Sequence, residues 1–228
     1  MLRPKKRITK KEMRHDPVVS TYARVTTFYY ENKKYITNAL IALALIVVAG
    51  FVISNNRRAS SEKAASELGK VYQLFDAGQY SQAIDGVPER GIMGLKAIVE
   101  NYSGPSAELA RFYLANSYYY MGNYDEALKH FKDAGLGDDI LQASALAGAA
   151  ACYEAKGDHP SAAKYYEKAQ DKAPKSPVAA EYLHHAAYNY GMAGDKEKAI
   201  NLFKRLRKDY PNSTQARDVD RYIAQFSV

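Results

Sequence analysis

The residues of this chain that could do chemistry are its histidines, its single cysteine and one glycine-rich acidic segment. His184 and His185 are adjacent, so on a helix they point about 100° apart and cannot share a metal ion as an i, i+4 pair does. Residues 135–139 (GLGDD) lack the Lys-Ser/Thr of a phosphate-binding loop and the alternating acidic ligands of an EF-hand. Cys152 precedes Tyr153 in a run of small residues, where a packing role is usual. The sequence therefore predicts no catalytic, cofactor or metal site, and we expect the protein not to be an enzyme.

Positive charge is concentrated at the N-terminus. The chain has 32 Lys and Arg against 25 Asp and Glu, a net charge of +7. Residues 1–35 alone hold ten basic and three acidic side chains, so residues 36–228 are neutral overall. The net positive charge of the chain thus comes from its short N-terminal tail, and the body is not expected to bind nucleic acid. The basic cluster Lys5–Arg14 favours contact with anionic lipid, and binding to ribosomal RNA or a nascent-chain complex is the alternative.

A long apolar run follows the tail. Residues 36–54 contain no charged side chain and would span about 28 Å as a helix, enough to cross a hydrocarbon core. A cleaved signal peptide is the alternative, but both the leader and the apolar run are longer than is usual for one. We expect a basic tail (1–35), a retained transmembrane helix (36–54) and a polar linker (55–65). In the tail, helical spacing predicts a short interfacial helix through Val18, Val19, Tyr22, Val25 and Tyr29.

The distribution of basic residues gives the expected orientation. The 20 residues before the span hold three basic side chains and the 20 after it hold four, so the local count does not decide. Counted over the whole tail, ten basic residues precede the span, and the charge of a short flank has more influence on orientation than that of a long domain. We expect the N-terminus in the cytoplasm and the body of the protein on the other side of the membrane.

The body repeats a pattern of glycine, alanine and tyrosine. A glycine is followed five residues later by an alanine four times, at Ala83, Ala127, Ala162 and Ala199. Nine residues before the last three alanines stands a tyrosine, and four residues after them stands Phe131, Tyr166 or Phe203. Pro174 and Pro211 each follow their alanine by twelve residues. The last three alanines are 35 and then 37 residues apart.

This pattern resembles the tetratricopeptide repeat, whose period is about 34 residues. The resemblance implies an all-α solenoid over residues 66–228, following the N-terminal transmembrane helix. We expect four helical hairpins, at about 66–104, 107–140, 142–176 and 179–212, and a capping helix over 213–228. The glycines would end the first helix of each hairpin, and the alanines would lie where the paired helices come closest.

The first repeat is longer than the others. Residues 85–92 (DGVPERGI) are an insertion into its second helix, and their glycines and proline predict a loop or kink. After Pro211, Ser213 or Thr214 is positioned to cap a last helix that ends near Phe226 and covers the open end of the stack.

The resemblance also implies a protein-binding groove lined by the first helices. Its positions in this chain are Tyr72, Phe75, Phe112, Asn116, Tyr119, Tyr120, His184, His185 and Tyr188. The third repeat contributes only Ala147, Ala151 and Glu154. The lysines with which chaperone-binding members clamp a C-terminal carboxylate are missing, so an apolar or aromatic client is expected. The alternative for each aromatic residue is packing against the capping helix.

The arrangement of a basic tail, one span and tetratricopeptide repeats is similar to that of the periplasmic ancillary subunit of the bacterial Sec translocon. This resemblance implies an inner-membrane, single-pass protein with periplasmic repeats. It would be an adaptor without cofactors, and its partners would be translocon subunits, chaperones or secreted clients. Two alternatives stay open: a cytoplasm-facing scaffold or organelle import receptor, and a structural component of the envelope or cell-division complex.

Overall fold

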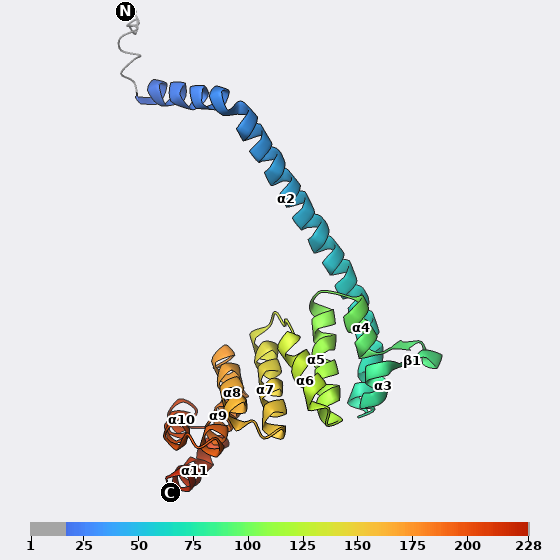
Figure 1. Ribbon diagram of the computed structural model, residues 1–228, viewed down its shortest axis with the longest axis vertical. Coiled ribbons are helices and arrows are strands. Elements are labelled where there is room, and N and C mark those ends of the chain that lie inside the picture. The colour runs from blue at the N-terminus through green and yellow to red at the C-terminus, as the bar shows by residue number, and fades with distance from the viewer. Residues whose placement is uncertain (1–16, 228) are drawn as a thin grey trace, which may run out of the picture. The chain divides into compact units, whose positions relative to one another are not determined.

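The computed structural model describes residues 17–227, with the side chains of residues 17–20, 23 and 24 left aside. Two units divide the chain, one ending at Asn56 and the other beginning at Arg57. The basic cluster Lys5–Arg14 lies outside the described residues. Nearly all of the described chain is helical, and the predicted fold class is confirmed (Figure 1).

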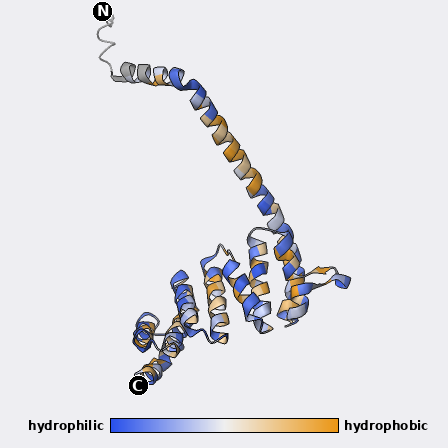
Figure 2. Ribbon diagram, in the orientation of Figure 1, coloured by the Kyte–Doolittle hydropathy of each residue, from blue (hydrophilic) through white to orange (hydrophobic). Residues whose placement is uncertain are grey.

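The first unit consists of the N-terminal part of helix α2, which runs from Pro17 to Asp76. It carries the apolar stretch expected from the sequence, seen in Figure 2 as the hydrophobic segment of α2. This is the one helix among the described residues that is long and apolar enough to cross a membrane, and its apolar window is not buried against the rest of the protein. The segment expected to form an interfacial helix is helical, with Tyr22, Val25 and Tyr29 exposed.

The second unit is a stack of helical hairpins. Residues 55–65, expected as a linker, are part of helix α2, whose C-terminal part supplies the first helix of the first hairpin. Consecutive helices from α3 onward pack against one another. In chain order they are α3 (Tyr80–Asp85), α4 (Leu95–Asn101), α5 (Pro105–Tyr120), α6 (Tyr124–Asp133), α7 (Asp139–Ala155), α8 (His159–Lys172), α9 (Ala179–Met192), α10 (Lys196–Asp209) and α11 (Val219–Phe226).

The repeated residues have the structural roles that their types predict. Gly78, Gly122, Gly157 and Gly194 follow the first helices with φ between +70° and +89°, a conformation that costs little only for glycine. The second helices begin at side-chain caps: Asn123, Asp158 and Asp195 each accept a hydrogen bond from a backbone N–H three residues on. The four repeat alanines are completely buried, because they lie where the two helices of a hairpin meet.

The insertion in the first repeat is more ordered than the expected loop. A short hairpin pairs β1 (Gly86–Val87) with β2 (Ile92–Met93), and the 3₁₀ turn η1 (Pro88–Arg90) joins the strands. A Cβ atom on Gly86 would lie 2.6 Å from the carbonyl oxygen of Ile92, so only glycine fits there. The strand side chains Val87, Ile92 and Met93 pack against the core of the first repeat. The inserted residues therefore split the second helix into α3 and α4.

The C-terminal helix covers the end of the stack, as expected. The Ser213 hydroxyl accepts a hydrogen bond from the backbone N–H of Ala216 at 3.2 Å, at the start of the 3₁₀ turn η2 (Gln215–Asp218) that leads into α11. From α11, Val219 and Phe226 are buried in the core of the last repeats. The ring of Tyr222 stacks on Phe203 with centroids 5.1 Å apart.

We predict that adding one methyl group at Gly191 unseats this cap. A Cβ atom there would lie 2.5 Å from the ring of Phe226, so Gly191→Ala should displace α11 and lower the midpoint of thermal unfolding. Overpacking of this kind costs about 1–3 kcal/mol, more than the gain of about 1 kcal/mol from replacing a helical glycine. Circular dichroism of the full chain in detergent measures the midpoint.

Gly69→Ala is the matched control, because Gly69 is also helical and a Cβ atom there has nothing within 4 Å. This variant should unfold at the same temperature as the parent chain or slightly above it. Equal midpoints for Gly191→Ala and Gly69→Ala would show that α11 is not seated as described.

Candidate protein-binding face

Aromatic rings from α2, α5 and the start of α3 form a connected cluster. The ring of Phe75 lies 4.9 Å from that of Tyr113, measured between centroids, and 6.2 Å from that of Tyr72. Tyr72 also meets Tyr113 edge to face at 5.4 Å, and Tyr120 stacks on Tyr80 at 4.8 Å. We call Tyr72, Phe75, Tyr80, Tyr113 and Tyr120 the aromatic cluster. It fixes aromatic rings on the first helices of the first two repeats.

Part of this cluster is open to solvent. Tyr72 is 42% exposed and Tyr120 is 58% exposed, while Phe75 beneath them is half-buried. Exposed tyrosines on a rigid support provide apolar contact area and a hydroxyl group at a small entropic cost, which is why they are common in protein interfaces. The cluster is therefore suited to holding an apolar or aromatic segment of another protein.

Three of the expected groove residues on α5 are turned more toward the interior. Phe112 meets the buried ring of Phe131 edge to face at 5.8 Å. The Asn116 side chain donates a hydrogen bond to the backbone carbonyl of Phe112 at 2.8 Å. Tyr119 is half-buried between neighbouring tyrosine rings, and burial raises the pKa of its hydroxyl. Phe112 therefore takes part in core packing, and the Asn116 side chain is used in a local hydrogen bond.

A carboxylate lies at the middle of the stack. Glu154 on α7 accepts a hydrogen bond from the Tyr166 hydroxyl at 2.9 Å, and its Oε2 atom is 3.9 Å from Nδ1 of His185. The His185 ring stacks on Tyr166 at 4.9 Å. Burial and the Glu154 carboxylate raise the pKa of Tyr166, so its hydroxyl stays protonated and continues to donate. Glu154 is thus held in a fixed position, with its side chain 28% exposed.

The remaining two groove positions, His184 and Tyr188, contact the capping helix. His184 meets Tyr222 edge to face at 4.8 Å, and Tyr188 lies 6.2 Å from Phe226. Burial, with a smaller contribution from His185, lowers the pKa of His184 to about 4, so its imidazole is neutral at pH 7. The alternative interpretation, packing against the cap, therefore holds for these two residues.

A pocket opens where α9 meets the C-terminal turn. Its lining residues, which we call the C-terminal pocket, are Glu181, His184, His185, Thr214, Gln215, Asp218 and Tyr222. Two of them are carboxylates, and none of these described residues is a lysine or arginine. His185 and His184 connect this pocket with Glu154 on α7.

Sequence reasoning missed Tyr113 and Tyr80, and it identified Tyr166 as a repeat position without its hydrogen bond to Glu154. Tyr113 could have been found, because Tyr113, Asn116 and Tyr120 follow one another at spacings of three and four, which places them on one helical face. Tyr80 and Tyr166 belong to second helices, and their roles depend on contacts across hairpins. The sequence carries no local signal for such contacts.

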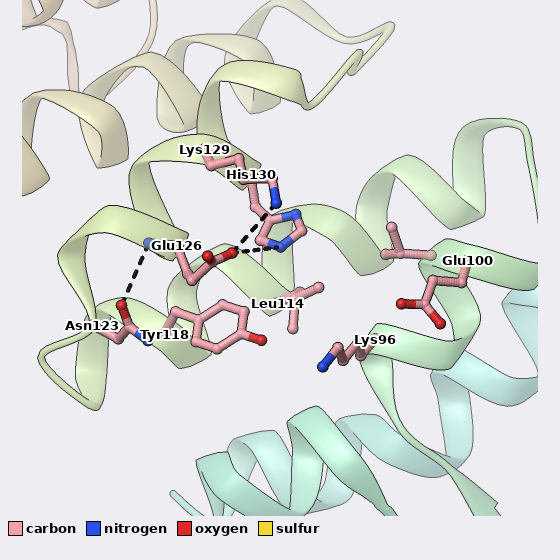
Figure 3. A pocket seen from close by; sticks show the side chains of 9 residues that line it. Lys96, Glu100, Leu114, Tyr118, Asn123, Glu126, Lys129 and His130 are labelled. Atoms are coloured by element: carbon pink, nitrogen blue, oxygen red, sulfur yellow. Dashed lines mark hydrogen bonds and ion pairs between the residues drawn. The ribbon is translucent and has the colours of Figure 1, made fainter.

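A second pocket, lined by α4, α5 and residues 123–130, is shown in Figure 3. Lys96 and Glu100 from α4 face Tyr118, Asn123 and His130 across it. Several of its polar groups are paired within the protein. Glu126 lies 3.6 Å from Lys129 and 3.8 Å from His130, and Asn123 accepts a hydrogen bond from the backbone N–H of Glu126. Burial and two nearby cations lower the pKa of His130, whose ring stacks on Tyr118. This pocket is therefore part of the hairpin packing.

The residues considered for chemistry do not form a reactive site. Cys152 is buried, and burial raises the pKa of its thiol to about 12, so it is not a thiolate at pH 7. Within residues 17–227, His, Cys, Asp and Glu side chains do not gather in groups of three that could hold a metal ion. Asp138 of the glycine-rich segment caps helix α7 by accepting from the backbone N–H groups of Ile140 and Leu141.

Two family models, both described as the tetratricopeptide repeat, match this chain, over residues 96–177 and residues 181–213. The chain matches no curated protein. It is similar to a variant of a kinesin light chain-like protein of Podospora anserina with nearly identical TPR-like repeats, at 16% identity and a TM-score of 0.54. That match covers 73% of this chain and 85% of the other. A second structure of those repeats matches at 14% identity and a TM-score of 0.49, covering 73% of this chain and 96% of the other. Likeness at this level concerns the fold alone.

We predict that His184 stays neutral well below pH 6. Because its pKa in the folded protein is lower than the ordinary 6.5, the unfolded chain takes up a proton first as the pH falls. The folded state should therefore lose stability between about pH 6.5 and pH 4 through this group. NMR of the full chain with labelled histidine, assigned with the His184→Gln variant, measures the titration. A midpoint near 6.5 for His184 would contradict its placement against Tyr222.

Proposed function

From the premise that this chain carries tetratricopeptide repeats, we propose that it is a membrane-anchored, non-catalytic adaptor. In this proposal its first helices bind segments of partner or client proteins. Tetratricopeptide domains in general bind protein partners, and they are usually scaffolds without catalytic activity. The observation that carries the proposal is the aromatic cluster, whose exposed Tyr72 and Tyr120 lie on the first helices of neighbouring repeats.

Helix α2 supports the membrane anchor. Its apolar side chains, such as Leu45, Ile46 and Phe51, are exposed, and no other part of the described chain covers them. An exposed apolar stretch of this length needs a bilayer or a partner to remove it from water. The sequence beside residues 51–56 has no convincing small-x-small cleavage site. We therefore favour a retained anchor over a removed signal peptide.

The charge distribution supports the proposed orientation. The tail, with its excess of basic residues, would stay in the cytoplasm, and the repeats would lie on the extracytoplasmic face of the inner membrane. On this face the partners would be translocon subunits, chaperones or emerging secreted clients. The overall arrangement, similar to the ancillary subunit of the Sec translocon, favours a place beside the secretion machinery. A cytoplasm-facing scaffold or import receptor is the rival that the opposite orientation would support.

Fusions at Val228 test the orientation. Alkaline phosphatase, which matures only outside the cytoplasm, should be active when fused there, and the chain should stay in the membrane pellet after alkaline carbonate washing. The same fusion on a chain without residues 36–54 is the control and should be inactive. A reporter that works only in the cytoplasm should be inactive at Val228, and its activity there would overturn the proposed orientation. Release of the chain from the membrane by carbonate would overturn the proposed anchor.

Site-specific photocrosslinking tests the binding face. A benzoyl-phenylalanine introduced at Tyr72 or Tyr120 should crosslink to other proteins in native membranes, because both side chains are exposed. The same group at Lys164, an exposed residue of the second helix α8, is the matched control and should give far less product. Many crosslinked species would indicate client holding, and one discrete species would indicate a fixed partner of the kind that an envelope or division complex requires. An equal yield of crosslinked product from position 164 would contradict the proposal that the first helices form the binding face.

A further inference from the structure

The first helices carry a continuous strip of interacting side chains. From the aromatic cluster, Tyr120 leads to Tyr119 at 5.8 Å between ring centroids. Tyr119 packs against the buried cluster that includes Ala149 and Cys152 of α7, and Glu154 on the same helix lies 3.9 Å from His185. His185 then meets His184, 5.6 Å away, at the edge of the C-terminal pocket. We call this path the first-helix strip: Tyr72, Phe75, Tyr113, Tyr120, Tyr119, Glu154, His185 and His184.

The two halves of the strip differ in charge. The half on α2 and α5 consists of aromatic rings. The half on α7 and α9 ends among carboxylates, with Glu154 on the strip and Glu181 and Asp218 in the C-terminal pocket. Arg221 lies 3.6 Å from Asp218 and 4.8 Å from the Tyr222 ring centroid, so it offsets the charge of Asp218. Glu154 and Glu181 are not within ion-pair distance of a lysine or arginine among the described side chains.

We infer that the strip binds a segment of a partner protein in which aromatic or aliphatic residues are followed by a lysine or arginine. The apolar residues would cover Tyr72 and Tyr120, and the basic side chain would reach the Glu154 and Glu181 carboxylates. This inference rests on the proposed function and names the chemistry of its partner.

Glu154 is well suited to receive a basic side chain. The Tyr166 hydroxyl fixes its Oε2 atom at 2.9 Å, so the carboxylate does not have to be ordered when a partner binds. A carboxylate has about four lone-pair sites in total, so one hydrogen bond from Tyr166 leaves capacity for a charged donor. Charge-assisted hydrogen bonds to a partly buried carboxylate are stronger than neutral ones. The tyrosine rings next to it can also attract a cation through their faces.

The chain's own basic tail has the right sign of charge, but the proposed topology places it across the membrane from the repeats. The occupant to which we commit is therefore a segment of another protein. The tail remains a rival occupant that the experiment must separate.

Binding of three fluorescein-labelled peptides to the full chain tests the inference. The peptides share one pattern of leucine and phenylalanine and differ only in whether lysine, glutamine or glutamate fills the remaining positions. The protein is held in nanodiscs of phosphatidylcholine, which has no net charge, and anisotropy reports the affinity. The lysine peptide should bind about tenfold more tightly than the glutamine peptide, and the glutamate peptide should bind more weakly than both.

Glu154→Gln combined with Glu181→Gln should reduce the advantage of lysine over glutamine to less than about twofold, because the amides keep the shape and remove the charge. Glu197→Gln, at an exposed acid on the second helix α10, is the matched control and should leave the preference unchanged.

Equal binding of the three peptides, or a lysine preference that survives the double substitution, would overturn the inference. Crosslinking from Tyr72 and Tyr120 would still support the proposed function in that case. Tighter binding of the lysine peptide after removal of residues 1–16 would show that the tail competes for the strip, and this would also overturn the assignment to a separate protein. No binding of any peptide would count against the inference alone.

Discussion

The structure depends on the close approach of paired helices at small residues. The repeat alanines, from Ala83 to Ala199, are completely buried at the contacts within hairpins. Gly148 and Gly191 extend this constraint to the contacts of Phe131 and Phe226, whose rings lie where a Cβ atom would otherwise be. Because each hairpin buries its apolar face only against its neighbours, the stack forms as a whole. This close packing fixes the positions of the first helices, and it therefore also fixes where their side chains lie.

Aromatic residues are consequently divided between two tasks. Some hold the stack together: Phe203 stacks on Tyr222, and Tyr190 donates a hydrogen bond to Glu167 on the preceding hairpin at 2.8 Å. Polar links reinforce this packing, since the buried Gln170 donates to the Tyr210 hydroxyl at 3.0 Å and accepts from Arg205. Within the described residues of the second unit, the aromatic side chains that stay exposed are Tyr72 and Tyr120. The proposed binding face therefore lies toward the N-terminal end of the repeats, away from the cap.

Most of the fold could be predicted from the sequence, whereas the binding face could be predicted only in outline. The spacing of glycine and alanine specifies the helices and their ends, because each of those roles is local. The insertion after Asp85 was expected as a loop, and its hairpin depends on Val87, Ile92 and Met93 reaching the core, which is a long-range contact. The structure places the expected groove positions on first helices, and their binding of a partner stays a prediction. Which of them stays open depended on where Phe226 and Tyr222 dock, and no periodicity specifies that.

The electrostatics of the face follow from the same packing. Burial beside Tyr222 and His185 lowers the pKa of His184 and keeps it neutral, so this imidazole does not add positive charge to the pocket as the pH falls from 7 toward 5. The Tyr166 hydroxyl, which burial keeps protonated, donates to Glu154 and holds its carboxylate in place. In the proposed binding, partners would be selected by the sign of their charge as well as by their apolar surface, and the interior packing of the repeats positions the Glu154 carboxylate that would make this selection.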